Sequence, residues 1–160
     1  MDIFWEELTS GLPDTRQLVH VIIRLIAAAL LGAVVGFQRE KVGKPAGLRT
    51  HMLVTLGTTV FVLACSGAGM SSDGLSRVIQ GIITGIGFIG AGSILKLSEE
   101  RAIQGLTTSA GIWMTAAVGV AVGLGSLGVA LLSTLMALII LALVPLESRI
   151  DKGVEKAEDR

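Results

Sequence analysis

Charged residues are scarce in this sequence. Only 16% of its 160 residues are charged, while 51% are hydrophobic and the mean hydropathy is +0.74. A soluble domain carries about 25% charged residues, so this composition cannot supply a polar shell and predicts a single membrane-embedded bundle instead. The formal net charge is +0, so no global field attracts nucleic acid and we expect no nucleic-acid partner.

Other absences limit the chemistry. Cysteine occurs once, at Cys65 within an apolar run, so it forms no internal disulfide and does not indicate a redox compartment. No carboxylate falls within a predicted span, although ion carriers usually place one there. No cluster of His and Cys has metal-ligand spacing, and no nucleophile–base–acid set is visible. We therefore expect neither an enzyme nor a cofactor or metal site.

Long apolar runs separated by short polar segments predict five transmembrane helices, because one crossing needs about 20 residues. The first three runs cover residues 17–37, 52–72 and 78–95. The uncharged run from 102 to 146 holds two more spans, which the glycine-rich segment 123–128 divides. The predicted fold is all-α, a polytopic membrane protein with five helices in a glycine-rich bundle.

This pattern divides the chain into three parts. They are an interfacial N-terminal segment at residues 1–15, a five-helix transmembrane domain at 16–146 and a charged tail at 147–160. Asp14 or Thr15 is expected to cap the first span. Pro145 is expected to end the last span, because proline cannot donate to the helix ladder.

Lysine and arginine are unevenly divided between the two sides of this topology. The side that holds the 38–51 loop, the 96–104 loop and the tail carries Arg39, Lys41, Lys44, Arg49, Lys96, Arg101, Arg149, Lys152, Lys156 and Arg160. The opposite side carries Arg16 and Arg77. The positive-inside rule therefore predicts a bacterial inner-membrane protein with its N-terminus outside and its C-terminus in the cytoplasm.

The segment Gln38–His51 is the densest polar stretch between two spans. A charge at the bilayer centre costs about 2.5–3.5 kcal/mol, so the segment is expected to be a loop in water with Arg49 and His51 at the interface. Glu40 is expected to pair with a neighbouring cation, and Thr50 to cap the second span. The loop is either an anchor on lipid phosphates or a shaped site for a partner's carboxylates or an anionic ligand. The candidate binding residues are Arg39, Glu40, Lys44, Arg49, Thr50 and His51.

Polar residues within or beside the other spans form a second set of candidates. An unpaired arginine inside a span is costly, so Asp73 is expected to cap the third span and to pair with Arg24 or Arg77. Thr107 or Thr108 is expected to cap the fourth span. These polar residues either hold the helices together or line a polar path for a ligand. The candidates are Arg24, Asp73, Arg77, Gln80, Thr107, Thr108 and Trp113.

Glycines at helical spacing predict close contacts between helices. Gly32 and Gly36 form a GxxxG step in the first span, and Gly81, Gly85 and Gly92 lie near one face of the third. These five glycines are the candidate helix-packing positions. Because such faces also serve self-association, the pattern predicts a homodimer or a higher homo-oligomer.

Four of the motifs occur in the order LLGAVVGFQREK (30–41), KPAGLRTHMLV (44–54), GIGFIGAGSI (85–94) and GLTTSAGIW (105–113). In these stretches the chain resembles the MgtC/SapB family of bacterial membrane proteins. The resemblance covers the transmembrane domain only, without the soluble domain that follows the spans in the best-studied members. It implies a five-helix inner-membrane protein for adaptation to low magnesium, acid or life inside phagocytes.

Two functions follow from the residues and the resemblance together. The first is a non-enzymatic regulator that binds other membrane proteins in the plane of the bilayer. The alternative is a small oligomeric transporter or channel for Mg²⁺ or another solute. Its path would run past Gln80, Thr84 and the segment 107–109.

Overall fold

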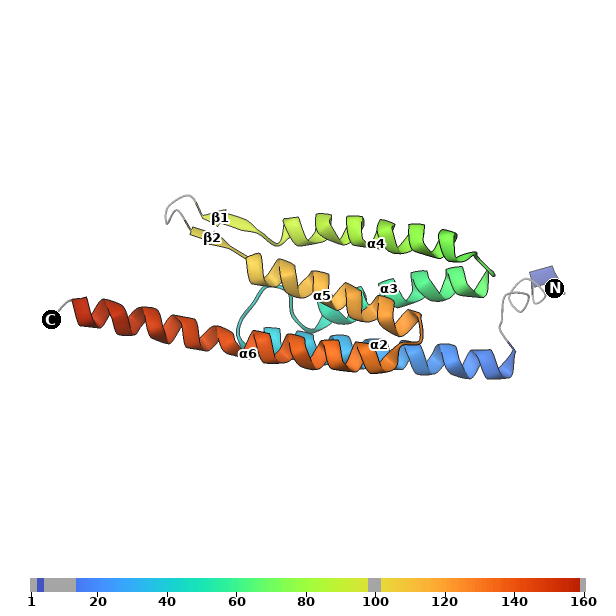
Figure 1. The fold of residues 1–160 in the computed structure, drawn as a ribbon, viewed down its shortest axis with the longest axis horizontal. Helices are drawn as coiled ribbons and strands as arrows, with labels where there is room; N and C mark the ends of the chain where they lie inside the picture. The colour runs from blue at the N-terminus through green and yellow to red at the C-terminus, as the bar shows by residue number, and fades with distance from the viewer. Residues whose placement is uncertain (1–2, 5–13, 98–101, 159–160) are drawn as a thin grey trace.

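The computed structural model describes residues 3–4, 14–97 and 102–158, without the side chains of residues 95–97, 102, 103 and 144–158. Five long helices run side by side (Figure 1): α2 (Thr15–Lys41), α3 (Leu48–Gly67), α4 (Ser72–Gly92), α5 (Leu106–Gly123) and α6 (Leu127–Glu158). Strands β1 (Leu95–Leu97) and β2 (Ala102–Gln104) pair antiparallel between α4 and α5. Apart from this small hairpin, in a segment expected to be a loop, the predicted all-α fold is confirmed.

The helices have the lengths that a membrane protein needs. Helices α2, α3, α4 and α5 are each long and apolar enough to cross a bilayer, and α6 opens with a shorter apolar stretch, Leu127–Leu143. Successive helices alternate in direction, so the chain ends lie at opposite ends of the bundle (Figure 1). The α2–α3 connection, the hairpin and the C-terminus share one end (Figure 1).

Helix α2 extends further than its apolar run. Residues 38–41, predicted to belong to a loop, continue the helix, because Gln, Arg, Glu and Lys are all good helix formers. The helix ends where Gly43 adopts a φ of 66°, and the amides of Gly43 and Lys44 bond back to the carbonyls of Glu40 and Arg39. The connection to α3 therefore shrinks to residues 42–47.

The caps of α2 and α4 were predicted with mixed success. Asp14 caps α2 as expected, since its carboxylate accepts from the amide of Gln17 at 2.7 Å. The prediction for Asp73 is wrong, because Ser71 occupies the cap of α4 and its hydroxyl accepts from the amide of Gly74 at 3.3 Å. Asp73 already lies in the first turn of the helix, where an acid still complements the helix dipole.

The prediction that Pro145 ends the last span is also wrong, because α6 continues through it to Glu158. Proline lacks an N–H, so the carbonyl of Leu141, four residues earlier, has no helical donor. The side-chain amide of Gln38 on α2 donates to that carbonyl at 3.3 Å. A polar side chain from a neighbouring helix thus supplies the hydrogen bond that the proline withholds.

Helix α3 lies between α2 and α5, which approach it closely at glycines. On α2, a Cβ at Gly32 would lie 2.7 Å from the carbonyl oxygen of His51, and one at Gly36 would lie 2.6 Å from the Cα of Leu48. On α5, a Cβ at Gly123 would lie 2.7 Å from the Cβ of Val62. The structure therefore places the predicted step at Gly32 and Gly36 against α3, where no larger residue fits.

No described helix packs closely against the α4 glycines that were expected to form a contact face. A Cβ added at Gly81, Gly85 or Gly92 would meet nothing within 4 Å. Only Ile86 and Gly90 of α4 are buried. The common face that helical spacing gives these glycines is thus left open by the fold.

We predict that Gly32→Ala destabilises the protein by about 1–3 kcal/mol, because the new methyl group overpacks the α2–α3 contact. The measurement is the free energy of unfolding in mixed detergent micelles. Gly87→Ala is the matched control, since a Cβ there meets nothing within 4 Å. It should stabilise the helix by about 0.5–1 kcal/mol. Equal behaviour of the two variants would contradict the packing described here.

We predict that Gln38 and Pro145 are energetically coupled. Gln38→Leu should cost more stability with proline at 145 than in a Pro145→Ala background, where the new N–H can reach the Leu141 carbonyl. The expected coupling is about 0.5–1.5 kcal/mol, the net worth of one hydrogen bond. A double-mutant cycle is the right measurement because the buried Oε1 atom of Gln38 has no hydrogen-bond partner among the described residues, which lowers the cost of the single change. Strict additivity would refute this coupling.

Candidate functional site

The structure separates the six candidates of the segment Gln38–His51. Arg39 and His51 are buried within the helical bundle, with 1% and 0% of their surface exposed. Arg49, Glu40 and Lys44 are exposed and Thr50 is half-buried. His51 is buried because α3 starts at Leu48, so that residue 51 already belongs to the packed helix. The segment therefore supplies both a buried polar pair and an exposed basic surface.

Glu40 does not pair with a cation in the described part of the chain, contrary to expectation. Its Oε2 atom accepts from the amide of Leu48 at 3.0 Å. Leu48 is the first residue of α3, whose N-cap is Gly47, so the carboxylate replaces the cap predicted for Thr50. Helix starts leave N–H groups unpaired and favour negative charge, which explains this choice of partner.

Arg39 reaches from α2 to the start of α5. Its Nη2 atom donates to the hydroxyl of Thr108 at 3.1 Å, whereas its buried Nε atom has no hydrogen-bond partner among the described residues. No described carboxylate forms a salt bridge with it. A buried guanidinium normally pairs with an acid, because its desolvation is otherwise uncompensated.

His51 forms the second buried contact, between α3 and α5. Its Nδ1 atom lies 2.7 Å from the hydroxyl of Thr115, and that hydroxyl donates to the carbonyl of Gly111 at 2.8 Å. The tautomer of the ring decides whether Nδ1 donates to this hydroxyl or accepts from it. The Nε2 atom is buried without a partner among the described residues.

A polar cleft of about 530 Å³ opens beside Arg39, at the end of the bundle that holds the hairpin. Lys44 and Thr107 line it together with Arg39 and Thr108, and no described carboxylate does. Thr107 and Thr108 do not cap α5 as predicted, because Gly105 takes the cap with a φ of 95°. The threonines lie in the first turn of the helix, where the Thr108 hydroxyl accepts from Arg39.

Arg24 pairs with neither Asp73 nor any other described acid, so that expectation is wrong. Its Nη1 atom donates to the carbonyl of Gly123, the last residue of α5, at 2.9 Å. The carbonyls of Val120, Ala121 and Val122 accept from the amides of Leu124, Ser126 and Gly125. All four end carbonyls of α5 are thus satisfied, and the cation also meets the negative end of the helix dipole.

The remaining polar candidates lie on the outside of the bundle. Asp73, Arg77 and Gln80 are exposed on α4, and Trp113 of α5 is 48% exposed. The Thr84 hydroxyl donates to the Gln80 carbonyl of its own helix. The structure does not bring these residues together with Thr107 around one polar path.

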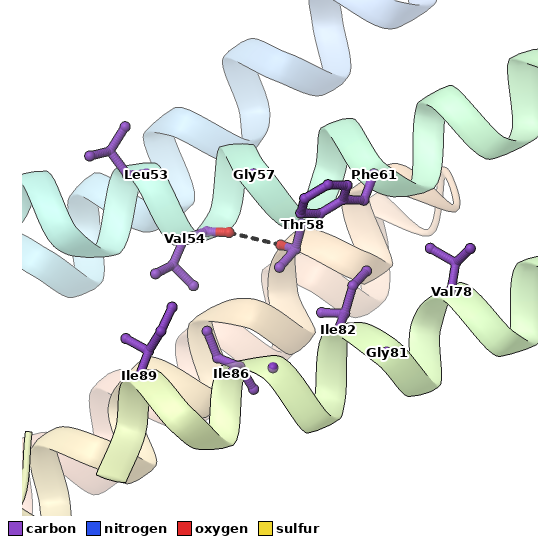
Figure 2. Close-up of a pocket in the computed structure, with 11 residues that line it drawn as sticks. Leu53, Val54, Gly57, Thr58, Phe61, Val78, Gly81, Ile82, Ile86 and Ile89 are labelled. Carbon is purple, nitrogen blue, oxygen red and sulfur yellow. Dashed lines mark hydrogen bonds between the residues drawn. The ribbon is translucent and has the colours of Figure 1, made fainter. Parts of the chain in front are cut away.

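An apolar groove of about 590 Å³ runs between α3 and α4 (Figure 2). From α3 it is lined by Leu53, Val54, Gly57, Thr58 and Phe61, and from α4 by Val78, Gly81, Ile82, Gly85, Ile86 and Ile89. The Thr58 hydroxyl turns back to the carbonyl of Val54, so it offers the groove no free donor (Figure 2). Two of the open α4 glycines therefore face a space that no described side chain fills.

The sequence analysis missed the small face of α5. Gly111, Thr115, Gly119 and Gly123 recur every four residues and are all buried. The Gly119 carbonyl accepts from Thr59 of α3 at 2.8 Å. The i, i+4 spacing of these small residues is typical of a packing face. The uncharged run from 102 to 146 was interpreted only by its length, as two spans.

These features define a polytopic all-α membrane protein whose core combines apolar residues, glycine and threonine with two buried basic side chains. Residues 25–149 match the model of the MgtC family, and the chain belongs to that family. It is 42% identical over 130 residues to Protein SrpB of Synechococcus elongatus, and 40% identical over 130 residues to the putative magnesium transporter YhiD of Escherichia coli. It is 43% identical over 117 residues to Protein MgtC of Salmonella typhimurium. No solved structure matches it.

The aligned region covers about three quarters of this chain in each case, that is 74%, 75% and 73%. It covers 71% of SrpB but only 58% of YhiD and 49% of MgtC. The region that matches the family model, residues 25–149, contains helices α3, α4 and α5 in full.

We predict that Thr115→Val destabilises the protein by about 1–3 kcal/mol, because the buried Nδ1 atom of His51 loses the hydrogen-bond partner that it has among the described residues. Thr84→Val is the matched control, since it makes the same exchange at an exposed hydroxyl that bonds only its own helix. Its effect should stay within about 0.5 kcal/mol. Thermal unfolding in detergent measures both changes. Equal losses would show that the histidine contact carries no special weight.

Proposed function

We propose that this protein is a non-enzymatic membrane regulator that binds a helix of another membrane protein in the groove between α3 and α4. The observation that carries the proposal concerns pairs of glycines four residues apart, and whether a neighbouring helix packs on each pair. The steps at Gly32 and Gly36 on α2 and at Gly119 and Gly123 on α5 are filled by α3. The step at Gly81 and Gly85 on α4 is empty and faces an apolar groove.

A transmembrane helix of a partner fits this groove for a physical reason. Lipid tails are as apolar as leucine, so helices associate in a bilayer through close packing rather than through the hydrophobic effect. Small residues let two helix backbones approach each other. Gly57 on α3 is a third glycine that lines the groove. Gly81 and Gly85 thereby acquire the contact role expected of them, with an external helix in place of an internal one.

The orientation proposed for this complex is that of an inner-membrane protein with its N-terminus outside. The α2–α3 connection, the hairpin and the C-terminus lie at one end of the bundle (Figure 1), which supports a common side for the basic segments. Exposed Arg49 and Lys44 then face the cytoplasm and contact anionic groups of lipid or partner.

Magnesium homeostasis is the physiological setting we propose, alongside acid or intracellular survival. It is supported by the name of YhiD, a putative magnesium transporter. The geometry favours regulation over transport of the ion. Gln80 and Thr84 lie exposed on α4, and among the described residues no group of three or more His, Cys, Asp or Glu side chains could hold a metal.

We predict that Gly81→Leu combined with Gly85→Leu fills the groove and abolishes capture of the partner, while the fold survives because both Cβ positions are open. Crosslinking in native membranes followed by mass spectrometry measures the partner. Gly87→Leu is the matched control, since it adds the same bulk at an open glycine that does not line the groove. It should leave partner yield unchanged.

Three outcomes would overturn the proposal. Unchanged partner capture by the Gly81 and Gly85 variant would show that the groove is not the contact surface. Crosslinks that join the groove only to a second copy of this chain would replace the regulatory partner with self-association. Flux of Mg²⁺ in reconstituted vesicles that responds to Gln80→Ala would favour the transporter instead.

A further inference from the structure

We propose that the cleft beside Arg39 is a binding site for a phosphate-type oxyanion, held between α2, the α2–α3 connection and the start of α5. This inference goes beyond the proposed function and does not depend on it. The ligand class is a tetrahedral oxyanion, supplied either by free phosphate or by the headgroup of an anionic phospholipid.

The first argument is an uncompensated charge. Arg39 has 1% of its surface exposed, and its Nε atom has no hydrogen-bond partner among the described residues. Its one described side-chain contact, the hydroxyl of Thr108, is neutral. Glu40, the neighbouring acid, is committed to the amide of Leu48 instead. A buried guanidinium without an acid is strongly unfavourable, so the site calls for an anion from outside the described residues.

The second argument is the composition of the cleft wall. Lys44 adds a second cation, and Thr107, Gln104 and Ser93 are further polar residues that line it. Its volume of about 530 Å³ accommodates a phosphate group with part of the molecule that carries it. Two cations and no described carboxylate line the cleft, so the lining suits an anion and opposes a metal cation.

The third argument is the end of α5 that faces the cleft. Gly105, Leu106, Thr107 and Thr108 all line it, and they comprise the N-cap and first turn of that helix. The cap is a glycine and the first turn contains no acid, so no side chain of its own neutralises the positive end of the dipole. Free N–H groups at a helix start bind phosphate and sulfate readily, and here they lie beside an arginine.

The geometry of Gly105 holds this arrangement in place. Its φ of 95° is a left-handed conformation that favours glycine, and a Cβ there would collide with the carbonyl oxygen of Ser93. The amide of Lys44 donates to the carbonyl of Arg39 at 3.1 Å, which ties the connection to the end of α2. These backbone contacts fix the segments from which the Arg39 and Lys44 side chains extend.

The test measures the melting temperature of the full chain in nanodiscs of zwitterionic phosphatidylcholine, with phosphate titrated against chloride at equal ionic strength. Phosphate should raise the melting temperature in a saturable manner, because a ligand that binds only the folded state stabilises it. Lys44→Gln should weaken the apparent phosphate affinity about tenfold, since it removes a charged donor. Arg49→Gln, an equal charge change outside the cleft, should leave the affinity unchanged.

Arg39→Met provides a second, distinct readout. It should abolish the phosphate response and yet melt no lower than the unmodified protein in phosphate-free buffer, because it also removes the uncompensated charge. Should Arg39→Met fail to fold, Lys44→Gln and Thr107→Val carry the test. Thr107→Val should weaken phosphate binding if the start of α5 holds the anion.

The source of the phosphate group is decided in parallel nanodiscs that contain phosphatidylglycerol. If the headgroup is the ligand, these nanodiscs raise the melting temperature by themselves, the rise depends on Arg39 and Lys44, and added phosphate has no further effect. If free phosphate is the ligand, its effect persists beside the lipid. The proposal is overturned if neither source stabilises the protein more than chloride does, or if Arg49→Gln weakens binding as much as Lys44→Gln.

Discussion

The close approach of three helix backbones is the constraint on which this bundle depends. Helix α3 fits between α2 and α5 because Gly32, Gly36, Gly119 and Gly123 leave no side chain in the way. A bilayer removes the hydrophobic driving force between helices, so stability comes from close contact and from satisfied polar groups. The small residues are therefore structural here, while many of the large apolar side chains face outward.

The same constraint explains why the interior is polar. Threonines of α3 and α5 are buried and bond either their own helix or a neighbouring carbonyl, as Thr59 does with Gly119. Side chains from other elements complete helix ends and gaps: Arg24 at the end of α5, Glu40 at the start of α3, and Gln38 at the carbonyl that Pro145 leaves open. In hydrocarbon an unpaired backbone group is expensive, so charged and amide side chains near the core are used as caps rather than as ion pairs.

Two regions differ from this pattern, and each contains an opening, the apolar groove and the polar cleft. Helix α4 keeps its glycine step empty above an apolar groove, which supports a contact with another membrane helix. Arg39 keeps a buried charge without a described acid, beside a polar cleft at one end of the bundle. The groove is apolar and lies between α3 and α4, while the cleft is basic and lies at the start of α5. A regulator with a partner surface and a separate anion site is a coherent interpretation of the two.

Much of this architecture follows from the sequence alone. Apolar runs of bilayer length, set against a shortage of charge, determined the membrane class and the five helices, because water and hydrocarbon sort residues by composition. The tertiary structure alone decided which polar groups meet. Arg24 and Glu40 bond helix ends instead of oppositely charged side chains, His51 is buried, and α4 leaves its glycines open. These choices depend on where helices start and how they are rotated against one another, which spacing along a chain does not specify.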